Sequence, residues 1–218
     1  MKKSLLLIAL VFSLTVFAQR GYRDGNRIGI SVGLTQTALM TSNFETKAET
    51  GWTTGFSVRG NYYNDWSMIF GMQLFKNQFS VATKSPLLKN EEVKYNSTGA
   101  QIRLLLSYNI VKDHVSLDFG PVLQVNDKLK FDSDFENNTI SGTLLTANDI
   151  INVTKFNGNF YTGISAGNRR VRAIVCYQFG LNNFLNNLNK DDVLRSKNNN
   201  NDFKGHLGIV SGQLLFNL

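Results

Sequence analysis

Two alternating segments at residues 101–124, QIRLLLSYNIVKDHVSLDFGPVLQ, constrain the fold more than any other feature of this sequence. Every second residue of each arm is bulky or apolar: Ile102, Leu104, Leu106, Tyr108, Ile110, and after a turn at 111–114, Val115, Leu117, Phe119, Pro121 and Leu123. The intervening residues are mostly small or polar, with a few isolated charges. A period of two predicts β-strands, so we interpret the segment as a hairpin with one oily and one polar face. A narrow polar interior with lipid outside fits this pattern better than a soluble sandwich.

The first 18 residues, MKKSLLLIALVFSLTVFA, have the pattern of a secretory signal. Lys2 and Lys3 precede an apolar run that is short for a bilayer span, and Ala18 stands before Gln19. We therefore expect cleavage after Ala18, with residues 1–18 as the signal peptide and 19–218 as the exported domain.

Charge and hydropathy narrow the class further. The chain carries a net charge of +7, but its basic residues are dispersed, which argues against nucleic acid as a partner. The surplus suits contact with lipid headgroups. After residue 18 no apolar run approaches the length of a spanning helix, so a membrane location would require a barrel.

The same alternation predicts six further strands, at about residues 27–37, 51–62, 66–80, 158–166, 171–182 and 203–218. Long polar connections are expected at 38–50, 81–92, 127–157 and 183–202, and short turns elsewhere. Alternating long and short connections are typical of outer-membrane barrels, with short turns in the periplasm and long loops outside. The sequence thus predicts an all-β, eight-stranded antiparallel up-and-down transmembrane β-barrel.

The predicted inner face carries a set of charged and amide side chains. The expected polar network of the lumen consists of Arg59, Gln73, Gln101, Arg103, Asp118, Arg172 and Gln178. An eight-stranded barrel is just wide enough for side chains to fill, so a polar plug is predicted. We expect Arg59 and Arg172 at the level of Asp118, near the short turns. Because three Arg face one Asp, an anion site or small anion-selective channel is the alternative.

Aromatic residues predict where the membrane interface lies. Tyr62, Tyr63 and Trp66 cluster beside the turn at 64–65, and together with Trp52 they are expected to form an aromatic girdle. A buried aromatic cluster is the alternative.

Residues capable of catalysis are sparse and scattered. His114 and His206 are predicted at opposite ends of the barrel, and Cys176 is the single cysteine. No common nucleophile, zinc or phosphate-loop motif occurs. We predict no enzymatic activity, no cofactor and no metal site.

Three segments carry a family resemblance: QIRLLLSYNIVKDHVSLDFGP, GFSVRGNYYNDWSMIFGMQLF and YQFGLNN. They resemble the PorT-like small outer-membrane β-barrel proteins of Bacteroidetes, and the signal ending before Gln19 is similar to signals of that phylum. The resemblance implies the outer membrane of a Gram-negative bacterium and a structural or accessory role in the cell envelope, with a type IX-like secretion complex as one setting. Leu218 departs from the family, in which an aromatic residue usually closes the chain.

The longest predicted loop, 127–157, contains apolar pairs at 144–145 and 150–151. Such pairs would be poor choices for a solvated spacer, so we expect this loop to contact an envelope or secretion protein. The alternative is a soluble periplasmic barrel that binds a small apolar ligand. Glycines beside Arg and Gln on the inner face disfavour it.

Overall fold

The computed structural model describes residues 27–218, and the predicted signal peptide lies outside the described residues. Eight long strands make up the body of the molecule: β1 (Arg27–Thr41), β2 (Thr46–Tyr63), β3 (Trp66–Lys84), β4 (Asn90–Val111), β5 (Val115–Asn126), β7 (Phe156–Gly167), β8 (Val171–Gly180) and β9 (Gly205–Asn217).

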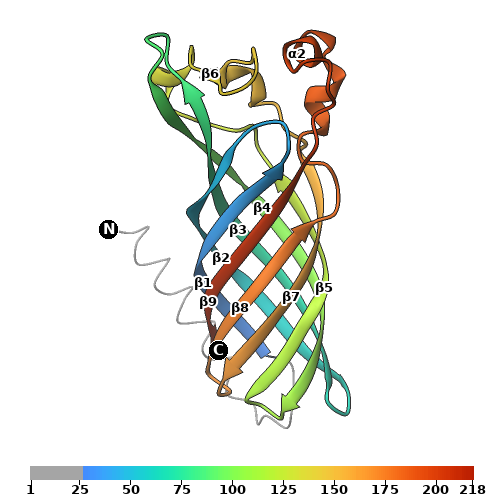
Figure 1. Cartoon of the computed structure of the whole chain (residues 1–218). Helices are drawn as coiled ribbons and strands as arrows, with labels where there is room; N and C mark the ends of the chain where they lie inside the picture. The colour runs from blue at the N-terminus through green and yellow to red at the C-terminus, as the bar shows by residue number, and fades with distance from the viewer. Residues whose placement is uncertain (1–26) are drawn as a thin grey trace, which may run out of the picture.

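Each long strand pairs antiparallel with its neighbour in the chain, and β1 also pairs with β9. Val32 lies opposite Leu214 in that closing pair, so the sheet forms a ring (Figure 1). The short strand β6 (Thr139–Ile140) adds to the end of β3 and stands outside the ring. The predicted eight-stranded antiparallel up-and-down barrel is therefore confirmed.

Side chains alternate between the outside and the lumen along every strand of the ring. On β3, Phe70 is exposed while Ile69 is buried, and the same alternation runs through β4 and β8. The outward register predicted for the last strand is also correct, because Leu214 and Phe216 face outward.

The two ends of the barrel differ. Turns at 64–65, 112–114 and 168–170 define what we call the turn end, and Asn64 and Asp113 adopt positive φ there. The other four connections lie at the opposite cap end, and each is longer than any connection at the turn end. Figure 1 shows β6 and the helix α2 (Asp192–Lys197) above the cap end.

The expected loops at 38–50 and 81–92 were wrong in extent. The chain leaves the sheet only between Thr41 and Thr46, and between Lys84 and Asn90. The apolar-outward pattern stops there because the outer face of the extensions carries charged residues, including the ion pair of Lys47 with Glu92 at 3.2 Å.

The two long connections fold into a cap, although 183–202 was predicted as a flexible loop. Its short helices are η2 (Ser133–Phe135), η3 (Ala147–Ile150), η4 (Asn186–Lys190) and α2. Their apolar side chains join inward-facing residues of the strand ends. The resulting cap core comprises Leu39, Phe44, Phe79, Val81, Val93, Tyr95, Leu129, Ile140, Leu145, Ala147, Ile150, Val153, Phe184, Leu185, Leu188, Phe203, Leu207 and Ile209. In residues 27–218, no helix is both long and apolar enough to cross a membrane.

Candidate functional site

The lumen is filled by polar side chains, and Asp118 is the acceptor at the centre of the layer nearest the turn end. Its Oδ1 accepts hydrogen bonds from Ser107 Oγ at 2.5 Å and Ser116 Oγ at 3.0 Å. Arg59 Nη2 donates to the same oxygen at 3.3 Å, and Arg59 Nη1 donates to Ser107 Oγ at 2.8 Å. Asp118 is therefore an ionised carboxylate held by one cation and two hydroxyls, the arrangement that makes a buried charge tolerable.

Arg172 completes this layer through neutral acceptors. Its Nη2 donates to Ser165 O at 3.1 Å and Ser165 Oγ at 3.0 Å, and its Nη1 donates to Asp113 O at 3.1 Å. Ser116 and Ser165 hydroxyls are 2.7 Å apart. Since Ser116 gives its one proton to Asp118, Ser165 is the donor in that pair. The three predicted residues Arg59, Asp118 and Arg172 thus meet at one level.

Arg103 lies further into the lumen and pairs with no carboxylate. Its guanidinium stands 5.8 Å from the ring centroid of Tyr161, a cation–π contact. Gly71 is its cross-strand neighbour, and a Cβ on that glycine would lie 2.7 Å from Arg103 Nε. The missing side chain of Gly71 therefore makes room for Arg103.

Glutamines form the next layer. Gln101 Nε2 donates to Gln73 Oε1 at 2.8 Å, and Gln73 Nε2 donates to Gln213 Oε1 at 2.8 Å and Ser31 Oγ at 3.0 Å. Gln178 is buried near this chain but outside it, and its Oε1 has no hydrogen-bond donor among the described residues. Toward the cap, Asn159 Nδ2 donates to Gln124 Oε1 at 2.9 Å.

The packed lumen leaves little open space. It encloses cavities of about 20 Å³ and about 10 Å³. Each has room for about one water, whereas pockets for small molecules measure about 300–1,000 Å³. The polar side chains therefore act as a plug.

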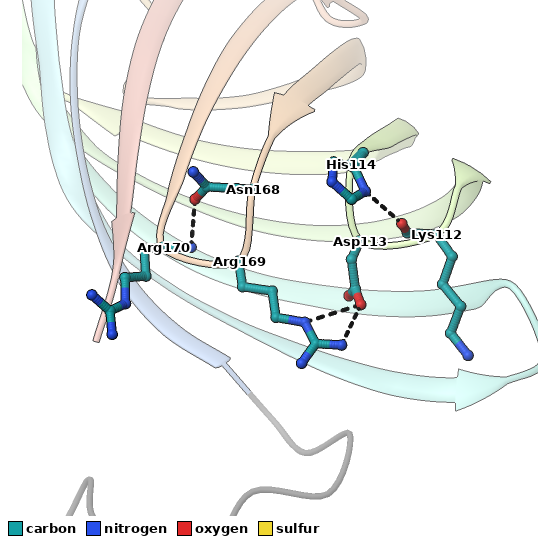
Figure 2. A pocket seen from close by; sticks show the side chains of 6 residues that line it. All are labelled: Lys112, Asp113, His114, Asn168, Arg169 and Arg170. Atoms are coloured by element: carbon teal, nitrogen blue, oxygen red, sulfur yellow. Dashed lines mark hydrogen bonds and ion pairs between the residues drawn. The ribbon is translucent and has the colours of Figure 1, made fainter.

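Asp113 organises the turn end (Figure 2). It pairs with Arg27 on β1 and with Arg169 in the last turn, where Arg169 Nη2 lies 2.8 Å from Asp113 Oδ2. These hydrogen bonds, first of all that from Arg27, lower the pKa of Asp113 to about 2. A hollow of about 620 Å³ lies beside it, lined by Lys112, Asp113, His114, Asn168, Arg169 and Arg170. The turns are thereby locked to each other and to β1.

The predicted aromatic girdle is divided between two levels. Trp66 lies at the turn end of the barrel, with ring centroids 5.0 Å from Tyr108 and 6.3 Å from Phe119, and Tyr63 is exposed beside it. Trp52 lies far along β2, opposite Lys76, so it does not join this cluster. The side chain of Tyr62 lies outside what the structure describes.

The possible catalytic groups are far apart. His114 contacts the carbonyl of Lys112 in a turn, whereas His206 stacks on Phe179 toward the cap end. Cys176 is buried with its Sγ 2.8 Å from Ser211 Oγ. Within residues 27–218 no group of three or more metal-ligating side chains converges.

Several contributors to the lumen were not among the residues singled out from sequence. Gln213, Ser107, Ser116, Tyr161 and Ser165 all occupy inward positions of the alternating pattern. A search of every inward position for any hydrogen-bonding side chain would have found them, because register alone decides which side chains enter a barrel. The pairing of Asp113 with Arg27 joins a turn to a strand start, and no local pattern marks it.

Comparisons with known proteins place the fold among small surface barrels. The sequence matches no protein-family model, and no curated protein is similar to it. Three solved structures are similar in shape. Neisserial surface protein A is 13% identical, with 88% of this chain and 98% of that chain covered at a TM-score of 0.46. Ail of Yersinia pestis is 12% identical, with 90% and 100% covered at 0.48. OprG of Pseudomonas aeruginosa is 8% identical, with 91% and 98% covered at 0.47.

Proposed function

We propose that this chain is an outer-membrane β-barrel that anchors its folded cap at the cell surface, in a structural or accessory role. The observation that carries the proposal is an apolar belt around the outside of the barrel. Its members are exposed, large and apolar: Ile28, Ile30, Val32, Leu34, Phe56, Phe70, Met72, Ile102, Leu104, Leu106, Leu123, Phe160, Ile164, Val175, Phe179, Val210, Leu214 and Phe216. Soluble proteins rarely expose a continuous apolar surface of this extent, whereas lipid solvates it.

Polar surfaces bound the belt at both ends. Toward the cap, the ion pairs Lys47 with Glu92 and Lys94 with Glu49 lie on the outer face. At the turn end, Lys112 and Arg170 are exposed. An apolar band between charged rims is what a barrel crossing a bilayer requires.

The connections supply the orientation. Outer-membrane barrels place short turns in the periplasm and longer connections outside, which puts the turn end inside and the cap outside. The resemblance of three segments to PorT-like proteins of Bacteroidetes supports a Gram-negative envelope and, more finely, a type IX-like secretion complex as the setting.

The lumen argues against the two alternatives. A soluble barrel that binds an apolar ligand needs an apolar cavity, and an anion-selective channel needs a continuous polar one. The two enclosed spaces of about 20 Å³ and 10 Å³ serve neither purpose. Function therefore resides on the surface, where loops on rigid scaffolds carry it.

The cap supplies a surface for a protein partner, as the sequence of residues 127–157 suggested. Leu145 and Ile150 of this segment are buried in the cap core, but Leu144 is 71% exposed. Leu87, Leu88 and Val193 are also exposed at the cap end. Apolar side chains on a surface above the membrane suit docking to another envelope protein.

Membrane placement is tested by fractionation and gel mobility. The mature protein is expected with the outer membrane, and as a closed barrel it should migrate faster unheated than boiled. Recovery from the periplasm without detergent would overturn the proposal.

The partner is tested by site-specific photocrosslinking in intact cells. A crosslinker at Leu144 should capture one defined envelope protein, whereas the same group at Lys112, exposed at the turn end, should not. Identical products from both positions would exclude a cap-specific partner while leaving the membrane placement intact.

A further inference from the structure

The charges enclosed in the lumen do not balance. Arg103 and Arg172 are buried, and the side chain of Arg59 is only 12% exposed, whereas Asp118 is the one buried carboxylate among the described residues. The neighbouring Arg27 is already paired with Asp113 at the turn end. Three guanidinium groups against one carboxylate leave an excess of two positive charges in the lumen.

Arg103 is where the missing negative charge is needed. It is 2% exposed, and its Nε and Nη1 have no hydrogen-bond acceptor among residues 27–218. A guanidinium cannot escape this situation by losing a proton. A buried cation with unpaired donors is unstable unless an anion compensates it.

A cavity of about 20 Å³ lies in the lumen at this residue. Polar groups lining it include Arg59, Arg103, Ser57 and Tyr161, and Ile69 and Leu105 form part of its apolar wall. Asp118 also lines the cavity, but its Oδ1 is occupied by three donors, so its charge is largely screened. The space suits one monatomic ion and excludes phosphate or a carboxylic acid.

We propose that this cavity binds a single small halide ion, chloride under physiological conditions, held by Arg103 and Arg59. The ion neutralises part of the charge excess and accepts the donors that Arg103 leaves unpaired. Because the cavity is enclosed by the plug, the ion is a structural component of the barrel, and no conduction is involved. This inference does not depend on the role of the cap.

The test compares unfolding in two salts. The purified barrel, folded in detergent, is exchanged into sodium chloride or sodium gluconate at equal ionic strength, since gluconate is too large for the cavity. The unfolding midpoint should rise with chloride and saturate, because the ion binds only the folded state. Arg103→Met should abolish the chloride-dependent rise, and Arg170→Met, which removes an exposed turn-end cation, should retain it.

A second readout needs no variant and keeps the proposal testable if Arg103→Met fails to fold. Crystals of the wild type soaked in bromide should show an anomalous peak beside Arg103. Equal midpoints in chloride and gluconate would show that water fills the cavity and would overturn the proposal, as would a bromide-soaked crystal without that peak. A peak without any chloride effect in solution would mean binding at crystal concentration only, and it would also count against the proposal.

Discussion

The hydroxyl of Tyr95 donates a hydrogen bond to the carbonyl oxygen of Ala147 at 2.8 Å, and both residues are fully buried. Tyr95 belongs to strand β4 and Ala147 begins the helix η3, so this bond joins the barrel wall to the cap. The ring of Tyr95 also stacks on Phe79, with centroids 5.8 Å apart. Barrel and cap therefore share one hydrogen-bonded and packed contact at this point.

Tyr95→Phe should loosen the cap while leaving the barrel closed. The substitution keeps the ring but leaves a buried carbonyl without its donor, at a cost of about 1–3 kcal/mol. Limited proteolysis in detergent should cleave residues 127–155 faster in the variant. Tyr108→Phe is the matched control, because Tyr108 faces outward in the apolar belt, and it should be cleaved like the wild type. Equal cleavage of all three proteins would mean that this bond does not hold the cap.

Asp118→Ala should be the most destabilising polar substitution in the lumen. It removes the only carboxylate of the layer and leaves Arg59 and Arg172 uncompensated, which typically costs about 3–5 kcal/mol. The unfolding midpoint in denaturant is the measurement. Asp192→Ala is the control, since Asp192 is exposed and its ion pair with Arg195, at 3.9 Å, is worth little. If both variants shift the midpoint equally, Asp118 does not carry the proposed network.

Asp113 predicts a pH dependence at the turn end. Its pKa in the folded state, about 2, lies below the usual value of 3.8. The ion pairs of Asp113 therefore stabilise the fold fully above about pH 4, and this contribution is lost as the pH falls toward 2. Asp113→Asn should cost about 1–2 kcal/mol at neutral pH, with solvent screening allowed for.

The stability difference between the wild type and Asp113→Asn should shrink on acidification and vanish near pH 2. Asn tolerates the positive φ of 63° at this position, so the comparison isolates the charge. Asp65→Asn, in another turn, is the control. A difference that does not change with pH would refute the role of the Asp113 ion pairs.

Leu104 and Leu87 test the solvent on each part of the surface. Leu104 is 47% exposed in the middle of the apolar belt, and Leu87 is 80% exposed at the tip of the β3–β4 hairpin. Leu104→Arg should cost about 2–4 kcal/mol in a bilayer, and Leu87→Arg should be neutral in water. Folding into lipid vesicles, followed by unfolding in denaturant, gives both values. A neutral Leu104→Arg would place the belt outside the membrane.

The strands of the belt could be predicted from sequence because lipid outside and a tight lumen inside impose opposite demands on successive residues. Ile28, Phe70 and Leu214 were assigned to the correct face for this reason. The rule fails where the strands leave the belt, since water and the cap core then replace lipid and lumen. Residues 38–50 and 81–92 were for that reason taken as loops, although most of them are strand.

The lumen was predictable in membership more than in pairing. Register places Arg59, Arg103 and Asp118 inside, but the choice of partner depends on strand tilt and side-chain length. Arg59 meets Asp118 while Arg103 meets Tyr161. The cap was unpredictable from local pattern, because its apolar residues are single positions dispersed among Asn and Asp.

The composition of the cap core fixes the order in which the molecule can assemble. Phe44, Val93, Ile140, Leu185 and Phe203 come from every part of the chain between β1 and β9. They reach one another only after β9 has joined β1, because that pairing brings the two ends of the sheet together. Closure of the wall therefore precedes burial of the cap core, and a protease-resistant cap is a late signature of a chain whose seam has sealed.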